Sequence, residues 1–299
     1  MTVIEMDGVT KRFGDVTALR GLDLTVEAGE VVGLVGPNGS GKSTALDVLL
    51  GYVRPTSGTV RAFGRDVPAD AAAVRQRVGA VSDAYAVYDR LSGRRHVEFA
   101  AALRGVEADP EQVLDRVGLA DAADQPAGTY SKGMAQRLVL GAALVGSPDL
   151  LVFDEPLSGI DPEGVSAIES ILREAADRGA AVVLASHRTD RLAAVCDRIA
   201  VLDGGELKAV RDGDVADGPT AISLTVEAVP EQVLTALRGR DGVRTVSHDG
   251  DRLRVVCDPD SRLAVLNDLD ARGVPVGRFE TADSSLTATY ESALSEEER

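Results

Sequence analysis

Short apolar runs and helical patterns alternate along the chain as far as about residue 210. The runs Glu30–Val35, Leu150–Phe153 and Ala181–Ala185 are almost continuously apolar, and each is followed by a polar loop and a helical pattern. Strands that are apolar on both faces are typical of a parallel sheet with helices on both sides. The pattern therefore predicts an α/β fold built on a parallel sheet.

The start of the chain and a middle segment follow other patterns. Residues 1–28 predict antiparallel strands at Val3–Met6 and Leu22–Val26, around a loop. The segment from about Ser92 to Gly118 is mostly helical in pattern. We therefore expect antiparallel strands and a helical region beside the parallel sheet.

The order of elements changes after Arg211–Thr220, a segment rich in Asp, Gly and Pro that predicts a linker. Beyond it the pattern indicates strand, helix, strand, strand, helix and strand. These are expected at Ile222–Val226, Glu231–Leu237, Arg244–Ser247, Arg252–Cys257, Arg262–Ala271 and Val274–Phe279. That order is ferredoxin-like, so the sequence predicts a small α+β domain.

The predicted boundaries are therefore a first domain at 1–212, a linker at 213–220 and a C-terminal domain at 221–299. A last helix is expected from Ser284, with an apolar packing stripe at Leu286, Tyr290 and Leu294. A charged tail at Ser295–Arg299 follows it.

Composition adds limits to this picture. The 299 residues include 48 Asp and Glu against 32 Lys and Arg, a formal charge of −16, which disfavours nucleic-acid binding. No run approaches the roughly 18 to 20 apolar residues of a membrane span, and the N-terminus lacks a secretory pattern. The spacing of Cys196 and Cys257 suits neither zinc nor a disulfide framework. We therefore expect a cytosolic protein with no membrane span of its own.

The basic residues are unevenly divided, with four lysines against 28 arginines. A carboxylate-rich surface with few lysines resembles that of proteins from salt-loving cells, in which high salt screens the self-repulsion. The composition therefore predicts a halophilic source.

The strongest chemical motif runs from Gly36 to Ser43 and matches G-x-x-x-x-G-K-[ST] between a strand and a helix. Its glycines let backbone N–H groups turn toward phosphate oxygens, and the helix start adds its positive dipole. We expect Lys42 to reach the β- and γ-phosphates and Ser43 to bind Mg²⁺. The expected nucleotide-binding residues are Gly36, Pro37, Asn38, Gly39, Ser40, Gly41, Lys42, Ser43 and Thr44. The alternative is a glycine-rich turn with an incidental lysine.

A second motif is the apolar strand that ends in Asp154 and Glu155. In phosphate-loop enzymes a strand of this kind places its aspartate beside the metal. We therefore expect Asp154 to hold Mg²⁺ and Glu155 to polarise an attacking water. A solvated carboxylate pair at a strand end is the alternative.

A third motif, YSKGMAQR, precedes an apolar helical pattern. Ser131 can cap that helix, and Gly133 permits a ligand to approach its N-terminal amides closely.

The order of GPNGSGKST, YSKGMAQRL, LLVFDEP, LSGIDP and the isolated His187 resembles that of ATP-binding cassette (ABC) ATPases over about residues 1–210. The resemblance implies ATP hydrolysis with Mg²⁺ and a fold with an antiparallel β subdomain and a helical subdomain. It implies that Ser131 and Gly133 contact the ATP held by a second copy, so that ATP joins a homodimer. Asp161 would be the acid of the loop at that interface, and His187 would reach the γ-phosphate. Phe13 would stack on adenine, although it could instead be a core residue.

Two departures from the family pattern refine the expectation. The signature is Ser-Lys-Gly-Met rather than Ser-Gly-Gly-Gln, which resembles the type 2 exporter class. Asp83 stands about where the family has a metal-binding glutamine, so it is a candidate Mg²⁺ ligand.

The resemblance further implies a separate membrane permease, docked on residues 85–118, with this chain peripheral on the inner face of the cell membrane. The C-terminal domain resembles, more weakly, an appendage of type 2 exporter ATPases. An importer ATPase with a substrate-sensing tail and a soluble ABC switch are the alternatives.

Overall fold

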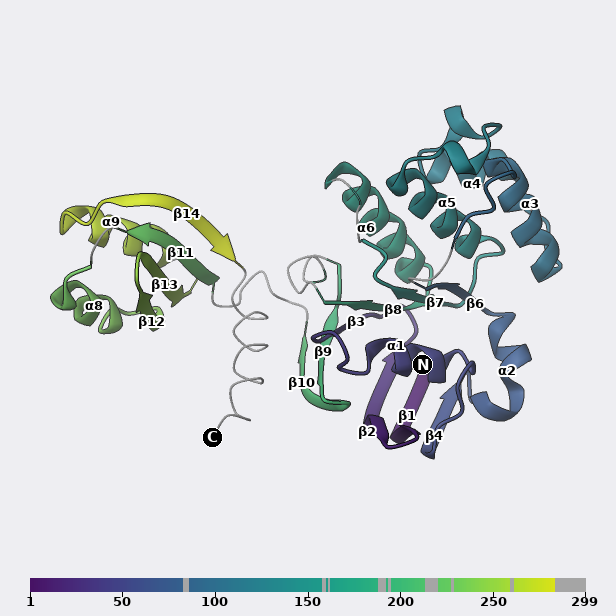
Figure 1. Ribbon diagram of the computed structural model, residues 1–299, viewed down its shortest axis with the longest axis horizontal. Helices are drawn as coiled ribbons and strands as arrows, with labels where there is room; N and C mark the ends of the chain where they lie inside the picture. Colours follow the sequence, from purple (N-terminus) through teal and green to yellow (C-terminus); the bar gives the residue numbers. More distant parts are fainter. Residues whose placement is uncertain are drawn as a thin grey trace. The chain divides into compact units, whose positions relative to one another are not determined.

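The computed structural model describes residues 1–82, 86–157, 160, 162–187, 192, 195–212, 220–226, 229–258 and 261–282. Two compact units make up the chain, Met1–Gly213 and Asp214–Arg299 (Figure 1). Most of the predicted linker and the predicted last helix and tail lie outside the described residues.

A six-stranded sheet forms the centre of the first unit, in the order β10-β9-β3-β8-β7-β6. Its strands are β3 (Val31–Val35), β6 (Val78–Val81), β7 (Leu150–Asp154), β8 (Ala181–Ser186), β9 (Arg198–Asp203) and β10 (Glu206–Asp212). All neighbours are parallel except β10, which is antiparallel to β9. Every residue of β3, β7 and β8 is buried, which confirms the predicted parallel sheet and its apolar strands.

Helices cover both faces of this sheet. Helix α6 (Pro162–Asp177) lies over one face, and α1 (Lys42–Leu49) lies with the antiparallel strands on the other (Figure 1). One continuous apolar core joins Leu34 and Val152 of the sheet to Leu46 of α1 and Leu22 of the antiparallel strands. Burial of this core stabilises the unit by roughly 25 cal/mol for each Å² of apolar surface removed from water.

The antiparallel strands at the start of the chain are longer than predicted. They form a sheet in the order β2-β1-β4-β5, with α2 following β5. The elements are β1 (Thr2–Phe13), β2 (Val16–Glu27), β4 (Ser57–Ala62), β5 (Arg65–Asp66) and α2 (Val67–Arg75). The antiparallel prediction is confirmed, since Ile4 pairs with Val26 and Met6 with Leu24.

The helical region contains α3 (Gly93–Arg104), α4 (Pro110–Arg116) and α5 (Lys132–Leu144), with short 3-10 turns at Ala120–Ala122 and Ala127–Thr129. Ser92, Asp109 and Ser131 each cap a helix by accepting a hydrogen bond from a backbone N–H of its first turn. These caps explain why the three helices begin where they do.

Arg104, in the last turn of α3, ties this helix to the sheet. Its guanidinium donates to the carbonyl oxygens of Val145 at 3.0 Å and of Val78 at 2.5 Å. Burial lowers the pKa of Arg104, and the two carbonyls take the place of the lost water. The contact therefore joins α3, the end of α5 and the start of β6.

We expect Arg104→Ala to lower the free energy of unfolding by about 2 kcal/mol, because two carbonyls lose a charged donor. Urea unfolding measures this. The control Arg95→Ala removes an exposed arginine of the same helix, which pairs with Glu98, and should change the stability by less than about 0.5 kcal/mol. Equal losses in both variants would contradict the role given to Arg104.

The second unit has the predicted ferredoxin-like order. Its elements are β11 (Thr220–Val226), α8 (Glu231–Arg238), β12 (Val243–Asp249), β13 (Arg252–Cys257), α9 (Arg262–Ala271) and β14 (Val276–Ala282). The sheet order is β12-β13-β11-β14, with every neighbouring pair antiparallel. Leu224, Val255, Leu237 and Leu269 meet in its own apolar core. The last strand begins two residues later than the sequence predicts.

Candidate functional site

The glycine-rich loop lies between β3 and α1, as its motif requires. Gly41, at φ +104°, is the residue just before α1, and a Cβ there would lie 2.6 Å from the carbonyl oxygen of Ala18. A Cβ at Gly36 would lie 2.2 Å from the carbonyl oxygen of Leu202. Both positions therefore require glycine, because strands β2 and β9 pack directly against the loop backbone.

Lys42 is buried beneath this loop. Its Nζ donates to the carbonyl oxygens of Gly36 at 2.7 Å and Pro37 at 3.0 Å. Burial lowers the pKa of Lys42, while the negative charges of Glu155 and Asp154 act in the opposite direction. The ammonium group is therefore held inside the loop, next to the two carboxylates.

The loop also contains a polar atom suited to a ligand. In the part of the chain that the structure describes, Ser40 Oγ is buried and has no hydrogen-bond partner. A buried hydroxyl without a partner is costly. Together with the helix start and Lys42, this hydroxyl fits an anionic group such as a nucleotide phosphate.

A cavity of about 380 Å³ opens over the loop. It brings together the glycine-rich loop, the predicted adenine-stacking Phe13 and the carboxylates of Asp154 and Glu155. It is lined by Phe13, Ala18, Asn38, Gly39, Ser40, Gly41, Lys42, Ser43, Thr44, Asp154 and Glu155. Phe13 lies at the end of β1 and is 49% exposed, so it is not a core residue. Lys11 Nζ lies 4.8 Å from the centre of its ring.

Glu155 is fixed to the end of β8. Its carboxylate accepts hydrogen bonds from the backbone N–H of His187 at 2.7 Å and from the hydroxyl of Ser186 at 2.9 Å. The ring Nδ1 of His187 also lies 2.7 Å from Glu155 Oε1. Glu155 adopts φ +52°, a conformation that non-glycine residues rarely take. The structure therefore brings Glu155 and His187 together. Ser186, which no sequence motif marks as a site residue, also contacts Glu155.

The signature segment lies apart from this cavity. Ser131 is exposed and caps α5, accepting from the N–H of Met134 at 3.2 Å. A Cβ at Gly133 would meet no atom within 4 Å, so the start of α5 is open. Neither residue lines the cavity of its own chain.

Two predicted site residues, Asp83 and Asp161, lie outside the described residues. Their assignments stay predictions.

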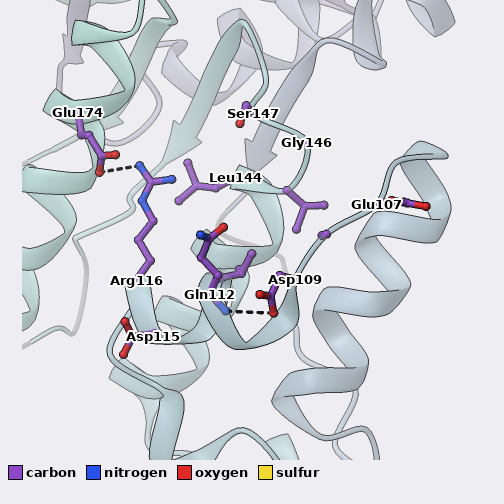
Figure 2. Close-up of a pocket in the computed structure, with 12 residues that line it drawn as sticks. Glu107, Asp109, Gln112, Asp115, Arg116, Leu144, Gly146, Ser147 and Glu174 are labelled. Carbon is purple, nitrogen blue, oxygen red and sulfur yellow. Dashed lines mark hydrogen bonds and ion pairs between the residues drawn. The ribbon is translucent and has the colours of Figure 1, made fainter.

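A second cavity, of about 550 Å³, lies between α4, the end of α5 and α6 (Figure 2). Arg116 pairs there with Glu174 at 2.8 Å, and Asp109 is occupied as the cap of α4. None of the predicted site residues that the structure describes lines it. The candidate site is therefore the cavity over the glycine-rich loop.

Comparison with known proteins defines the class. A family model described as ABC transporter matches residues 19–158. The daunorubicin/doxorubicin resistance ATP-binding protein DrrA of Streptomyces peucetius is 32% identical over 96% of this chain and 91% of that protein. The linearmycin resistance ATP-binding protein LnrL of Bacillus subtilis is 33% identical over 82% of each. The chain therefore belongs to the ABC transporter ATP-binding protein family, which confirms the resemblance. It is an ATP-hydrolysing subunit of an ABC transporter.

Solved structures agree on the fold. One described as the ATP binding subunit of an ABC transporter has a TM-score of 0.66 at 25% identity, covering 72% of this chain and 92% of that one. A dimeric ATP-binding cassette, MJ0796, in a post-hydrolysis state with ADP and phosphate has a TM-score of 0.64 at 23% identity, covering 70% and 98%. Among the described residues, no helix is long and apolar enough to cross a membrane. The halophilic source inferred from composition stays a prediction.

Proposed function

We propose that this subunit works as a homodimer on the inner face of the cell membrane, where it drives export through a separate permease. The observation on which this depends is the cavity that joins the glycine-rich loop to Asp154 and Glu155. The Ser-Lys-Gly-Met signature supports the export direction, as do relatives named for resistance to daunorubicin, doxorubicin and linearmycin.

Each predicted residue has a part in this proposal. Lys42 and the loop amides bind the β- and γ-phosphates of ATP, and Phe13 stacks on the adenine. Ser43 and Asp154 hold Mg²⁺, with Asp83 as a further candidate ligand. The cation, when bound, neutralises phosphate charge.

Glu155 and His187 act on the terminal phosphate. Three protein groups orient the Glu155 carboxylate at the wall of the cavity. A carboxylate fixed in this way needs little reorganisation before it polarises a water. His187 contacts the γ-phosphate from the same place, at the end of β8.

The separation of the signature from the cavity supports the homodimer. Ser131 is exposed, Gly133 has free space beside its Cα, and neither residue lines the cavity. We propose that they, with Asp161, complete the ATP site of the second copy.

An exposed apolar face on the helical region suits the permease. We define the docking face as Tyr88, Phe99 and Leu103. The exposed fraction of the side chain is 53% for Tyr88, 42% for Phe99 and 73% for Leu103. Tyr88 and Phe99 meet edge to face at 5.7 Å, and Leu103 lies one helical turn beyond Phe99. An apolar group of this kind on a strongly acidic protein indicates a partner.

The test is to co-express the subunit with a candidate permease, a membrane protein that has several predicted spans. Leu103→Asp should reduce the amount of subunit recovered with that protein by about tenfold, since the interface would bury an unpaired charge. The control Val210→Asp alters an exposed apolar residue elsewhere, in β10, and should recover wild-type amounts. Equal recovery of both variants would contradict the docking face. Failure of even the wild type to associate would favour the soluble switch.

A further inference from the structure

The turn between β9 and β10 lies directly behind the glycine-rich loop. The backbone N–H of Gly205 donates to the carbonyl oxygen of Ser40 at 3.1 Å. Arg20 of β2 binds this turn through two hydrogen bonds. Its backbone N–H donates to the Gly205 carbonyl at 2.8 Å, and its Nε donates to the Gly204 carbonyl at 3.0 Å. A hairpin more than 160 residues away in sequence therefore contacts the loop backbone.

No side chain fits at this contact. Gly205 has φ +87°, and a Cβ there would lie 2.7 Å from the carbonyl oxygen of Ala18 and 3.2 Å from the Cα of Leu19. The same Ala18 oxygen would lie 2.6 Å from a Cβ at Gly41. Strand β2, the turn and the loop are thus in close backbone contact.

The hydrogen bond from Gly205 fixes one peptide of the loop. Ser40 O and the N–H of Gly41 belong to the same planar peptide, and in a trans peptide they point in opposite directions. Because Ser40 O points at Gly205, the N–H of Gly41 points away from the turn. The inward-facing amides of a phosphate loop require this orientation.

We propose that Gly205 is a positioning residue for the glycine-rich loop. Its N–H, and the absence of a side chain, orient the Ser40–Gly41 peptide so that the Gly41 N–H donates to a phosphate oxygen. This inference rests on the proposed binding of ATP phosphates by the loop.

Adjacent glycines provide the test. Gly204 and Gly205 both have positive φ, so alanine strains the backbone at either position, but a Cβ at Gly204 would meet nothing within 4 Å. Gly205→Ala should raise the KM for Mg-ATP about tenfold or more, because the loop peptide is displaced. Its kcat at saturating ATP should stay within about threefold of the wild type, since Glu155 and His187 are untouched. Gly204→Ala should stay within about twofold in both constants.

The proposal would be overturned if Gly205→Ala raised KM no more than Gly204→Ala does. It would also be overturned if Gly205→Ala lowered kcat by the same factor by which it raised KM. Lys42→Ala separates this outcome from failure of the proposed function. If Lys42→Ala loses ATP binding while Gly205→Ala keeps it, only the role of Gly205 is wrong. If both bind ATP normally, the phosphate assignment of the loop is wrong.

A measurement on the wild-type chain covers the case in which Gly205→Ala does not fold. In the nucleotide-free protein, the Gly205 amide should exchange about a hundredfold more slowly than an unprotected amide, as observed by NMR. Rapid exchange of this amide before nucleotide is added would overturn the preformed contact.

Discussion

Lys42→Ala should weaken the binding of Mg-ATP by roughly a hundredfold, as titration calorimetry would measure. Lys42 supplies a buried cation at the floor of the cavity, and hydrogen bonds to charged groups contribute about 1.5–3 kcal/mol each. The lysine already lies inside the loop and near Asp154 and Glu155. Its removal therefore takes away positive charge that no other described residue of the cavity lining provides.

The variant needs a stability control, because Lys42 also donates to two loop carbonyls. Their loss should lower the free energy of unfolding by about 1–3 kcal/mol. Binding is therefore compared at a temperature where the variant is folded by circular dichroism. Lys208→Ala, which removes a lysine paired with Glu206 on β10, should bind ATP as the wild type does. Wild-type affinity in folded Lys42→Ala would exclude Lys42 as a phosphate ligand.

The elements predicted best from sequence are those whose local pattern has one interpretation. Strands β3, β7 and β8 are apolar at almost every position because the sheet is covered on both faces. The glycine-rich loop could be located because its motif also fixes the elements on either side of it. By contrast, β4 has only Val60 and Ala62 buried among polar residues, so its pattern is too short to indicate a strand.

Strand boundaries were harder to predict where a loop residue next to the strand is apolar and buried. The predicted start of the last strand, Val274, is buried, but it lies before β14 and packs in the core of the second unit. Its apolar character reflects that packing rather than strand pairing. The register of β14 could therefore not be obtained from alternation alone.

The contacts within the site depend on strand order, which the sequence did not provide. Asp154 pairs with Ala185 across the parallel strands β7 and β8. This register places Glu155 beside Ser186 and His187, although 32 residues separate Glu155 from His187. The contact of Gly205 with Ser40 likewise depends on β9 lying next to β3. The order of the motifs indicated the candidate site residues. Which of those residues contact one another became clear only from the strand register.

Glu155→Gln should lower the rate of ATP hydrolysis by roughly 10²–10⁴-fold, the usual contribution of a positioned general base. Glutamine has nearly the same shape, but its amide lacks the charge and basicity needed to polarise water. Affinity for Mg-ATP should stay within about threefold of the wild type, since in the proposed site the loop and Lys42 bind the phosphates. Steady-state phosphate release and calorimetry measure the two quantities separately.

Glu174→Gln is the matched control. Glu174 lies in α6 and pairs with Arg116 and Arg178, away from the cavity over the glycine-rich loop, so its variant should hydrolyse ATP at close to the wild-type rate. If Glu155→Gln retains the wild-type rate, the carboxylate does not polarise the water.

The same variant tests the shared site. Ser131 is exposed, a Cβ at Gly133 would meet no atom within 4 Å, and both residues lie outside the cavity of their own chain. ATP that is bound and not hydrolysed should therefore hold two copies together. With saturating Mg-ATP, Glu155→Gln should sediment at twice the 31.2 kDa of one chain, and Ser131→Arg added to it should restore the monomer by blocking the start of α5. A monomer in Glu155→Gln under these conditions would show that one chain forms its ATP site alone, and the homodimer proposal would be wrong even if the rate of hydrolysis falls as expected.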